Sequence, residues 1–79
     1  MVTFFKNQKE LAQALIEIID SYWEKSLKEE EMMNKIEELV QKNREKIFTQ
    51  GDYASVIKQR LGKKRLALLI KVMELKGEN

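Results

Sequence analysis

The chain has 79 residues, a formal net charge of +2, and neither cysteine nor histidine. Its length allows one domain. The missing side chains exclude disulfides, thiolate chemistry and a histidine general base, and leave only carboxylates as zinc ligands, which disfavours a metal site. We therefore expect a protein that is not an enzyme and that uses no cofactor and no metal.

Apolar residues are spread along the chain. The longest uninterrupted apolar run, residues 66–70, is far shorter than the ~20 residues that span a bilayer. The start of the sequence has no basic segment followed by a long apolar core, as a signal peptide would. We therefore expect a cytoplasmic protein without a membrane segment. The absence of proline and the presence of only three glycines favour an all-helical chain.

The charge is distributed unevenly. Residues 1–40 carry five basic and nine acidic side chains, a net charge of −4, whereas residues 41–79 carry ten basic and four acidic ones, a net charge of +6. This asymmetry is the main indication of a partner.

The first predicted helix covers residues 7–24. Asn7 and Glu10 have the spacing of a capping box, and Phe4 or Phe5 is placed to pack on Leu11 as a hydrophobic staple. Apolar side chains then recur at helical spacing, at Leu11, Ala14, Leu15, Ile18, Ile19 and Tyr22.

The second predicted helix covers residues 27–43. Ser26 and Glu29 have the spacing of another capping box, and Glu29 is the first of three consecutive glutamates in the first turns, where the helix dipole favours them. So short a link predicts an antiparallel hairpin with the first helix. Six polar residues, 41–46, leave two alternatives open: the helix continues through them, or it breaks near Asn43.

Two further helices are predicted, over residues 53–61 and 63–76, with Asp52 as the N-cap of the former and Gly62 as the bend between them. Eight of the ten residues 66–75 are apolar, and their arc of roughly 220° exceeds the ~100° stripe of a surface helix. We therefore expect neighbours on several sides of this helix, supplied by its own domain or by a second copy. The predicted fold is an all-α four-helix domain, in which a helical hairpin packs on a second helix pair with the C-terminal helix central.

A basic run is the strongest candidate for a binding site, with Lys58, Arg60, Lys63, Lys64 and Arg65. The last three occupy a helical first turn, where the dipole disfavours positive charge. Three readings are open: contact with the phosphates of a nucleic acid or another polyanion, pairing with the acidic half of the same chain or of a second copy, or plain solvation of the charges. A base-reading helix-turn-helix is disfavoured, because residues 66–75 are too apolar to lie in a DNA groove.

The wide apolar arcs and the small size predict a homodimer. Its interface candidates are aromatic and aliphatic side chains on the first and last helices: Tyr22, Trp23, Leu68 and Val72. For Tyr22 and Trp23, packing in the core is the alternative.

Two stretches, residues 6–12 and 59–66, resemble a family of small uncharacterised proteins from spore-forming Gram-positive bacteria. The resemblance spans nearly the whole chain. It implies a bacterial, intracellular, stand-alone helical protein, and it brings no activity or site. The expected function is thus non-enzymatic: an accessory protein that binds nucleic-acid backbone or, alternatively, a homo-oligomeric interaction module whose acidic and basic halves pair across an interface.

Overall fold

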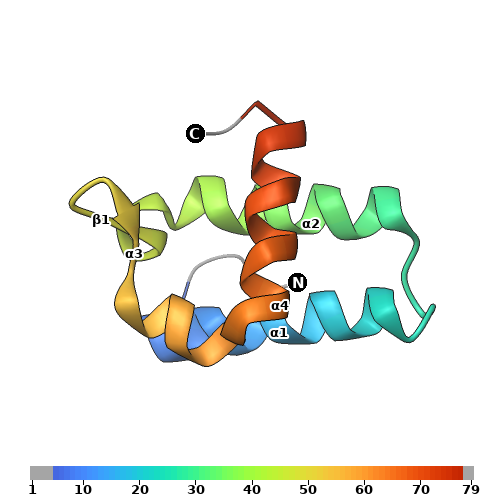
Figure 1. The fold of residues 1–79 in the computed structure, drawn as a ribbon, viewed down its shortest axis with the longest axis horizontal. Coiled ribbons are helices and arrows are strands. Elements are labelled where there is room, and N and C mark those ends of the chain that lie inside the picture. Colours follow the sequence, from blue (N-terminus) through green and yellow to red (C-terminus); the bar gives the residue numbers. More distant parts are fainter. Residues whose placement is uncertain (1–4, 78–79) are drawn as a thin grey trace.

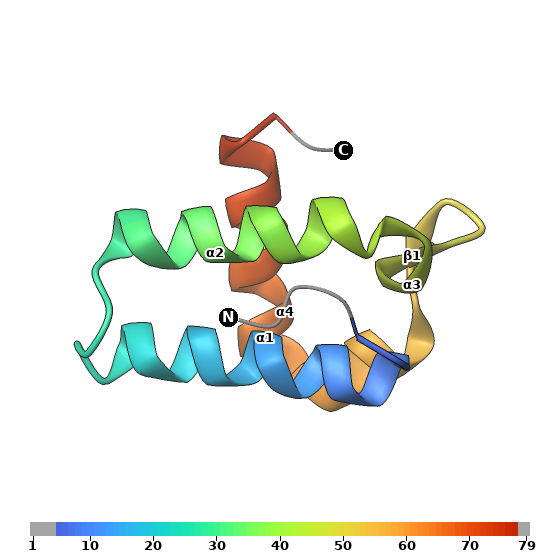
Figure 2. The same ribbon diagram turned by 180° about the vertical axis from the view of Figure 1, so that it is seen from behind.

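A computed structural model describes residues 5–77, which form a mostly helical domain (Figure 1). The helical hairpin is confirmed: α1 (Gln8–Trp23) and α2 (Glu29–Lys42) run antiparallel and side by side, and the last helix crosses both of them (Figures 1 and 2). The other elements are α3 (Arg44–Ile47), β1 (Phe48–Thr49), β2 (Asp52–Tyr53) and α4 (Ser55–Leu75).

The connection between α1 and α2 differs in detail from the predicted one. The amide oxygen of Asn7 accepts from the backbone N–H of Glu10 at 2.9 Å, as expected for the first cap. The second cap was wrong, because the N–H of Ser26 donates to the carbonyl of Ser21 at 2.9 Å and closes the end of α1. Lys25 has a φ of 67° in this closure, and α2 begins only at Glu29.

The start of the described chain packs on the hairpin. Phe5 is half-buried against the core, whereas Phe4, the other staple candidate, lies outside the described residues.

The break near Asn43 is the correct alternative. Asn43 ends α2, and its carbonyl accepts the N–H groups of Lys46 and Ile47, so that the short α3 follows at once. Its side chain is buried and donates from Nδ2 to the carbonyl of Leu39 at 2.8 Å. The polar residues after Val40 therefore turn a corner.

A two-stranded hairpin between α3 and α4 was not predicted. Phe48 pairs with Tyr53 and Thr49 with Asp52, across a turn in which Gln50 and Gly51 both have positive φ. Asp52 is thus a strand residue and not a helix cap: its carboxylate accepts the N–H of Tyr53 at 2.7 Å. The following helix begins at Ser55, after Ala54.

Gly62 divides α4 into the two predicted helical segments. Its φ of 78° and ψ of 177° lie in a region that is essentially restricted to glycine, so the chain bends there and a second segment begins at Lys63. Leu69, Val72 and Met73 on this segment are buried against the hairpin.

Within the described chain the last helix has neighbours on one side only, and its cover by a second copy stays a prediction. It lies on one face of the hairpin, with Ala67 and Leu75 exposed and other apolar residues only half-buried. All helices nevertheless contribute to one core, made of Leu11, Ala12, Leu15, Ile18, Ile19, Met32, Ile36, Leu39, Val40, Ile47, Ala54, Ile57, Leu61, Leu69, Val72 and Met73.

Candidate functional site

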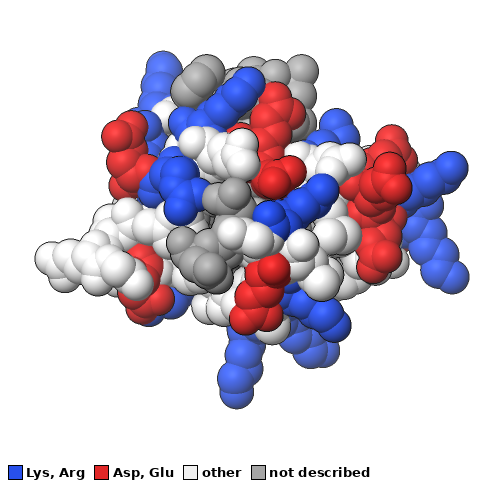
Figure 3. Space-filling view, turned by 90° about the horizontal axis from the view of Figure 1, so that it is seen from above, with Lys and Arg blue, Asp and Glu red and all other residues white. Residues whose placement is uncertain are grey.

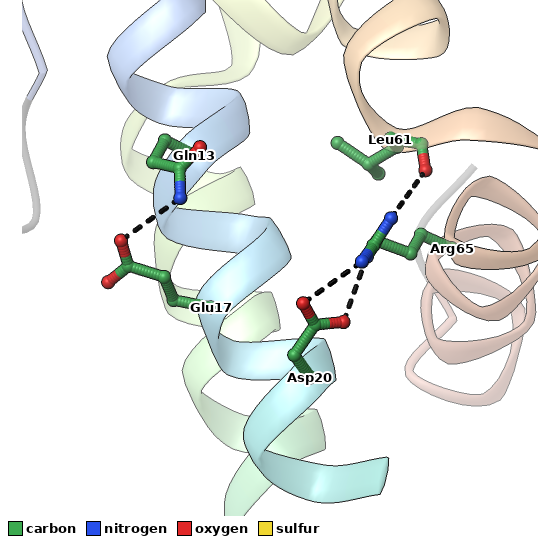
Figure 4. Close-up of polar contacts among 5 residues, drawn as sticks. All are labelled: Gln13, Glu17, Asp20, Leu61 and Arg65. Atoms are coloured by element: carbon green, nitrogen blue, oxygen red, sulfur yellow. Dashed lines mark hydrogen bonds and ion pairs between the residues drawn. The ribbon is translucent and has the colours of Figure 1, made fainter.

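Arg65, one of the five predicted polyanion-binding residues, is paired inside the molecule. Its Nε and Nη2 donate to the two carboxylate oxygens of Asp20 on α1, at 2.9 and 3.0 Å, and its Nη1 donates to the carbonyl of Leu61 at 3.4 Å (Figure 4). Both charged side chains are 33% exposed. The hydrogen bonds to Asp20 raise the pKa of Arg65. This bidentate pair fixes α4 on α1 and makes Arg65 a structural residue.

Lys58 is also paired. Its ammonium group lies 2.8 Å from the carboxylate of Asp52, just before the helix that carries it. The hydrogen bond from Lys58, together with the N–H of Tyr53 and the Lys58 charge, lowers the pKa of Asp52. The pair is exposed, so Lys58 remains accessible, but its charge is largely offset.

Arg60, Lys63 and Lys64 are the remaining members of the run, and we call these three residues the basic patch. All three are exposed, and none forms an ion pair or hydrogen bond with another residue of the described chain. They flank Gly62, where the bend begins a second helical segment, and the N–H groups in the first turn of a helix have no partner within that helix. The structure therefore reduces five candidate cations to three.

The acidic and basic halves of the chain do pair internally, but only in part. Besides Arg65 with Asp20, Lys76 reaches α2, where its Nζ lies 3.8 Å from Glu37 and donates to Asn34 at 2.7 Å. Seen from the end where α4 finishes, acidic and basic side chains are interspersed over the surface (Figure 3). Pairing within one chain thus accounts for Arg65 and Lys76, and leaves Lys63 and Lys64 unexplained.

The predicted dimer interface is corrected at one position. Val72 is 1% exposed in the core of its own chain and cannot contact a second copy. Tyr22 and Leu68 are half-buried against the same core, while Trp23 is 45% exposed. An interface role of Tyr22, Trp23 and Leu68 stays a prediction.

A groove of about 550 Å³ between α4 and the β-hairpin was missed by sequence reasoning. The aromatic rings of Phe48 and Tyr53 form one wall, with centroids 4.8 Å apart, and the guanidinium of Arg44 lies 5.2 Å from the centroid of Phe48. Ile70 and Met73 of α4 complete the apolar lining. Only the turn signal at Gln50–Gly51, between two aromatic residues, could have indicated it.

The polar lining of the groove contains three carboxylates, of Glu45, Asp52 and Glu74, and one cation, Arg44. Asp52 is already paired with Lys58, so Glu45 and Glu74 leave the lining with an excess of negative charge. Partial burial raises the pKa of Tyr53, and the negative charges of Glu74 and Asp52 raise it further. The groove therefore favours a ligand with positive charge and apolar surface.

Other site classes find no support in residues 5–77. These residues bring no group of three acidic side chains close enough together to hold a metal ion. No helix among them has the length and apolar character needed to cross a membrane.

Comparison with known proteins places the chain in a family without adding a site. A family model described as a conserved hypothetical protein matches residues 2–74. No curated protein and no solved structure matches the chain. The predicted resemblance to a small uncharacterised family is thereby confirmed, whereas an origin in spore-forming bacteria stays a prediction. Because the match covers nearly the whole sequence, the chain belongs to this family of conserved hypothetical proteins.

Proposed function

We propose that the protein binds the phosphate backbone of nucleic acids, weakly and without sequence preference, through the basic patch. The observation that carries the proposal is the presence of three exposed cations within five residues that lack a partner in the described chain. Lys63 and Lys64 occupy the first turn of a helical segment, where free N–H groups can donate to a phosphate. Such contacts depend on charge and leave base edges unread.

The number of available cations sets the expected salt dependence. Each phosphate contact on duplex DNA contributes about −0.9 to the slope of log K against log salt concentration. Three contacts predict a slope of about −2.7, whereas all five residues of the run would give about −4.5. The measured slope therefore shows whether only the three residues of the basic patch contact phosphate, or all five residues of the basic run.

The test is fluorescence anisotropy with labelled duplex DNA and single-stranded RNA, titrated at several salt concentrations. Arg60→Glu with Lys64→Glu should abolish binding, because repulsion replaces two of the three contacts. The matched control is Lys6→Glu with Lys9→Glu, which makes the same change in net charge at exposed positions before and within α1. No binding of the wild-type protein at low salt, or equal losses in both variants, would contradict the proposal.

Arg65 is unsuitable for this test. Replacing Arg65 by a glutamate would put two carboxylates side by side at the point where the Asp20–Arg65 pair now holds α4 on α1. A loss of binding would then report unfolding as much as a lost contact.

A further inference from the structure

One side of the second segment of α4 carries opposite charges at its two ends. Lys63, Ala67, Ile70 and Glu74 follow one another at spacings of four, three and four residues, so they share one side of the helix, and we call them the α4 stripe. Ile70 is half-buried and the other three are exposed. The stripe is therefore basic at its beginning, apolar in the middle and acidic at its end.

Both end charges are unfavourable within a single chain. Lys63 lies at the helix N-terminus and Glu74 in its last turn, each the reverse of what the helix dipole favours. Neither takes part in an ion pair with a described residue. Glu74 instead adds its charge to the partly buried surroundings of Tyr53 and raises the pKa of that residue. Interactions within the described chain thus give no reason for the charge of Lys63 or of Glu74.

The acidic end of the stripe borders the groove. Ile70 and Glu74 line it together with Met73 and the two aromatic residues of the β-hairpin, and Glu45 adds a second carboxylate. A lysine that approached from outside would find carboxylates for its ammonium group and an apolar surface for its aliphatic stem.

The stripe is complementary to itself. If two copies meet about a two-fold axis level with the peptide between Leu68 and Leu69, the two helices run antiparallel. Lys63 then faces the partner's Glu74, and Ala67 faces the partner's Ile70. The symmetry forms each contact twice, and the small side chain of Ala67 allows the backbones to approach closely.

We infer that the protein forms a two-fold homodimer through the α4 stripe, with the lysine of each copy at the acidic end of the other. The charges favour a second copy as the partner, because each stripe carries both the basic end and the acidic end that complements it. The inference goes beyond nucleic-acid binding and does not depend on it. Lys64 lies about 100° round the helix from Lys63, and Arg60 precedes the bend, so both remain outside the stripe. The dimer would use Lys63 but leave Arg60 and Lys64 of each copy for phosphate contacts, so the slope expected for three contacts applies to the monomeric chain.

The experiment measures self-association of the full-length chain by sedimentation velocity over a range of concentrations. Lys63→Glu and Glu74→Lys each juxtapose like charges at both ends of the interface and should weaken dimerisation at least about tenfold. Each substitution also suits the helix dipole, so both variants should keep the helical circular dichroism of the wild type.

The decisive sample is a mixture of the two variants. In a heterodimer, the new glutamate at position 63 faces the partner's new lysine at position 74, and the unchanged Lys63 and Glu74 face each other at the other end. Mixing should therefore restore dimers near the wild-type strength, as should the double variant K63E/E74K. A control swap on α1, Lys9→Glu with Glu10→Lys, should leave dimerisation unchanged.

Several results would overturn the inference. A wild-type chain that is monomeric at every concentration rules out the dimer, and it is the result expected if the groove instead holds a basic segment of another protein. Dimers that tolerate both single reversals place the interface elsewhere. Single variants that stay monomeric when mixed show that Lys63 does not face Glu74. The variant R60E/K64E, which tests nucleic-acid binding, should dimerise normally, so the two proposals can fail separately.

Discussion

At the scale of single residues, Asn43 connects three parts of the described chain. Its side chain is 2% exposed, donates to the carbonyl of Leu39 at 2.8 Å and accepts from the N–H of Phe5 at 3.4 Å. Its own carbonyl starts α3. A buried amide is tolerated only when hydrogen-bonded, so these contacts fix where α2 ends and where the chain before α1 packs.

Asn43→Ala should lower the free energy of unfolding by about 1–3 kcal/mol, because it removes the side-chain bonds and leaves buried backbone groups without partners. Urea unfolding followed by circular dichroism measures the change. The control is Asn34→Ala on α2, which removes an exposed hydrogen bond to Lys76 and should cost less than about 1 kcal/mol. Similar losses in the two variants would show that Asn43 has no special role.

At the scale of secondary-structure elements, the bend at Gly62 has the largest effect on the fold. Without it, residues 55–75 would form one straight helix. The first segment could then not lie beside α1 while the second crosses the hairpin (Figures 1 and 2). The bend also gives the second segment its own N-terminus, which is where the basic patch lies. One glycine thus determines both the packing of α4 and the position of the proposed site.

Gly62→Ala tests this dependence. A methyl group would meet no atom within 4 Å, so the expected cost is backbone strain alone, on the order of 1–3 kcal/mol. Gly77→Ala is the matched control: its φ is 76°, but it lies after the end of α4, so its conformation does not set the angle between two packed helical segments. Thermal unfolding should show a lower midpoint for G62A and little change for G77A. If both behave like the wild type, the conformation at Gly62 is not a constraint on the fold.

The sequence was most informative about features that depend on neighbouring residues. Apolar periodicity and glycine placed α1, α2 and the two segments of α4 within two residues of their observed bounds, because these signals act over one or two turns. The four-residue α3 was not predicted. The Ser26 cap failed for a local reason, since the end of α1 uses the same N–H group. The two strands were not predicted, because each has only two residues and so shows no alternation of polar and apolar side chains.

Contacts between distant segments could not be predicted. Asp20 and Arg65 are 45 residues apart, and nothing in either stretch indicates that they meet. The basic run therefore looked like five equivalent cations, of which two are paired in the fold. The groove was missed for the same reason, because its walls come from α3, the β-hairpin and α4.

At the scale of the whole molecule, the hairpin and α4 depend on each other. The inner faces of α1 and α2 are covered by one helix that contacts both of them, and buried residues from every helix form a single cluster. A domain of this size has a stability of only several kcal/mol. Neither the hairpin nor α4 buries enough apolar surface alone, so we expect one cooperative unit.

Leu69→Ala tests the cooperativity. Leu69 is fully buried where α4 meets the hairpin, and truncating such a leucine costs about 2–5 kcal/mol. Two probes should be followed in urea: circular dichroism, which reports all helices, and fluorescence of Trp23, which lies at the end of α1. If hairpin and α4 form one unit, both transitions shift to lower urea by the same amount and remain coincident. A Trp23 transition that keeps its wild-type midpoint while the dichroism shifts would mean that the hairpin folds without α4. In that case the Asp20–Arg65 pair, and with it the position of the basic patch, would belong to a helix that can detach.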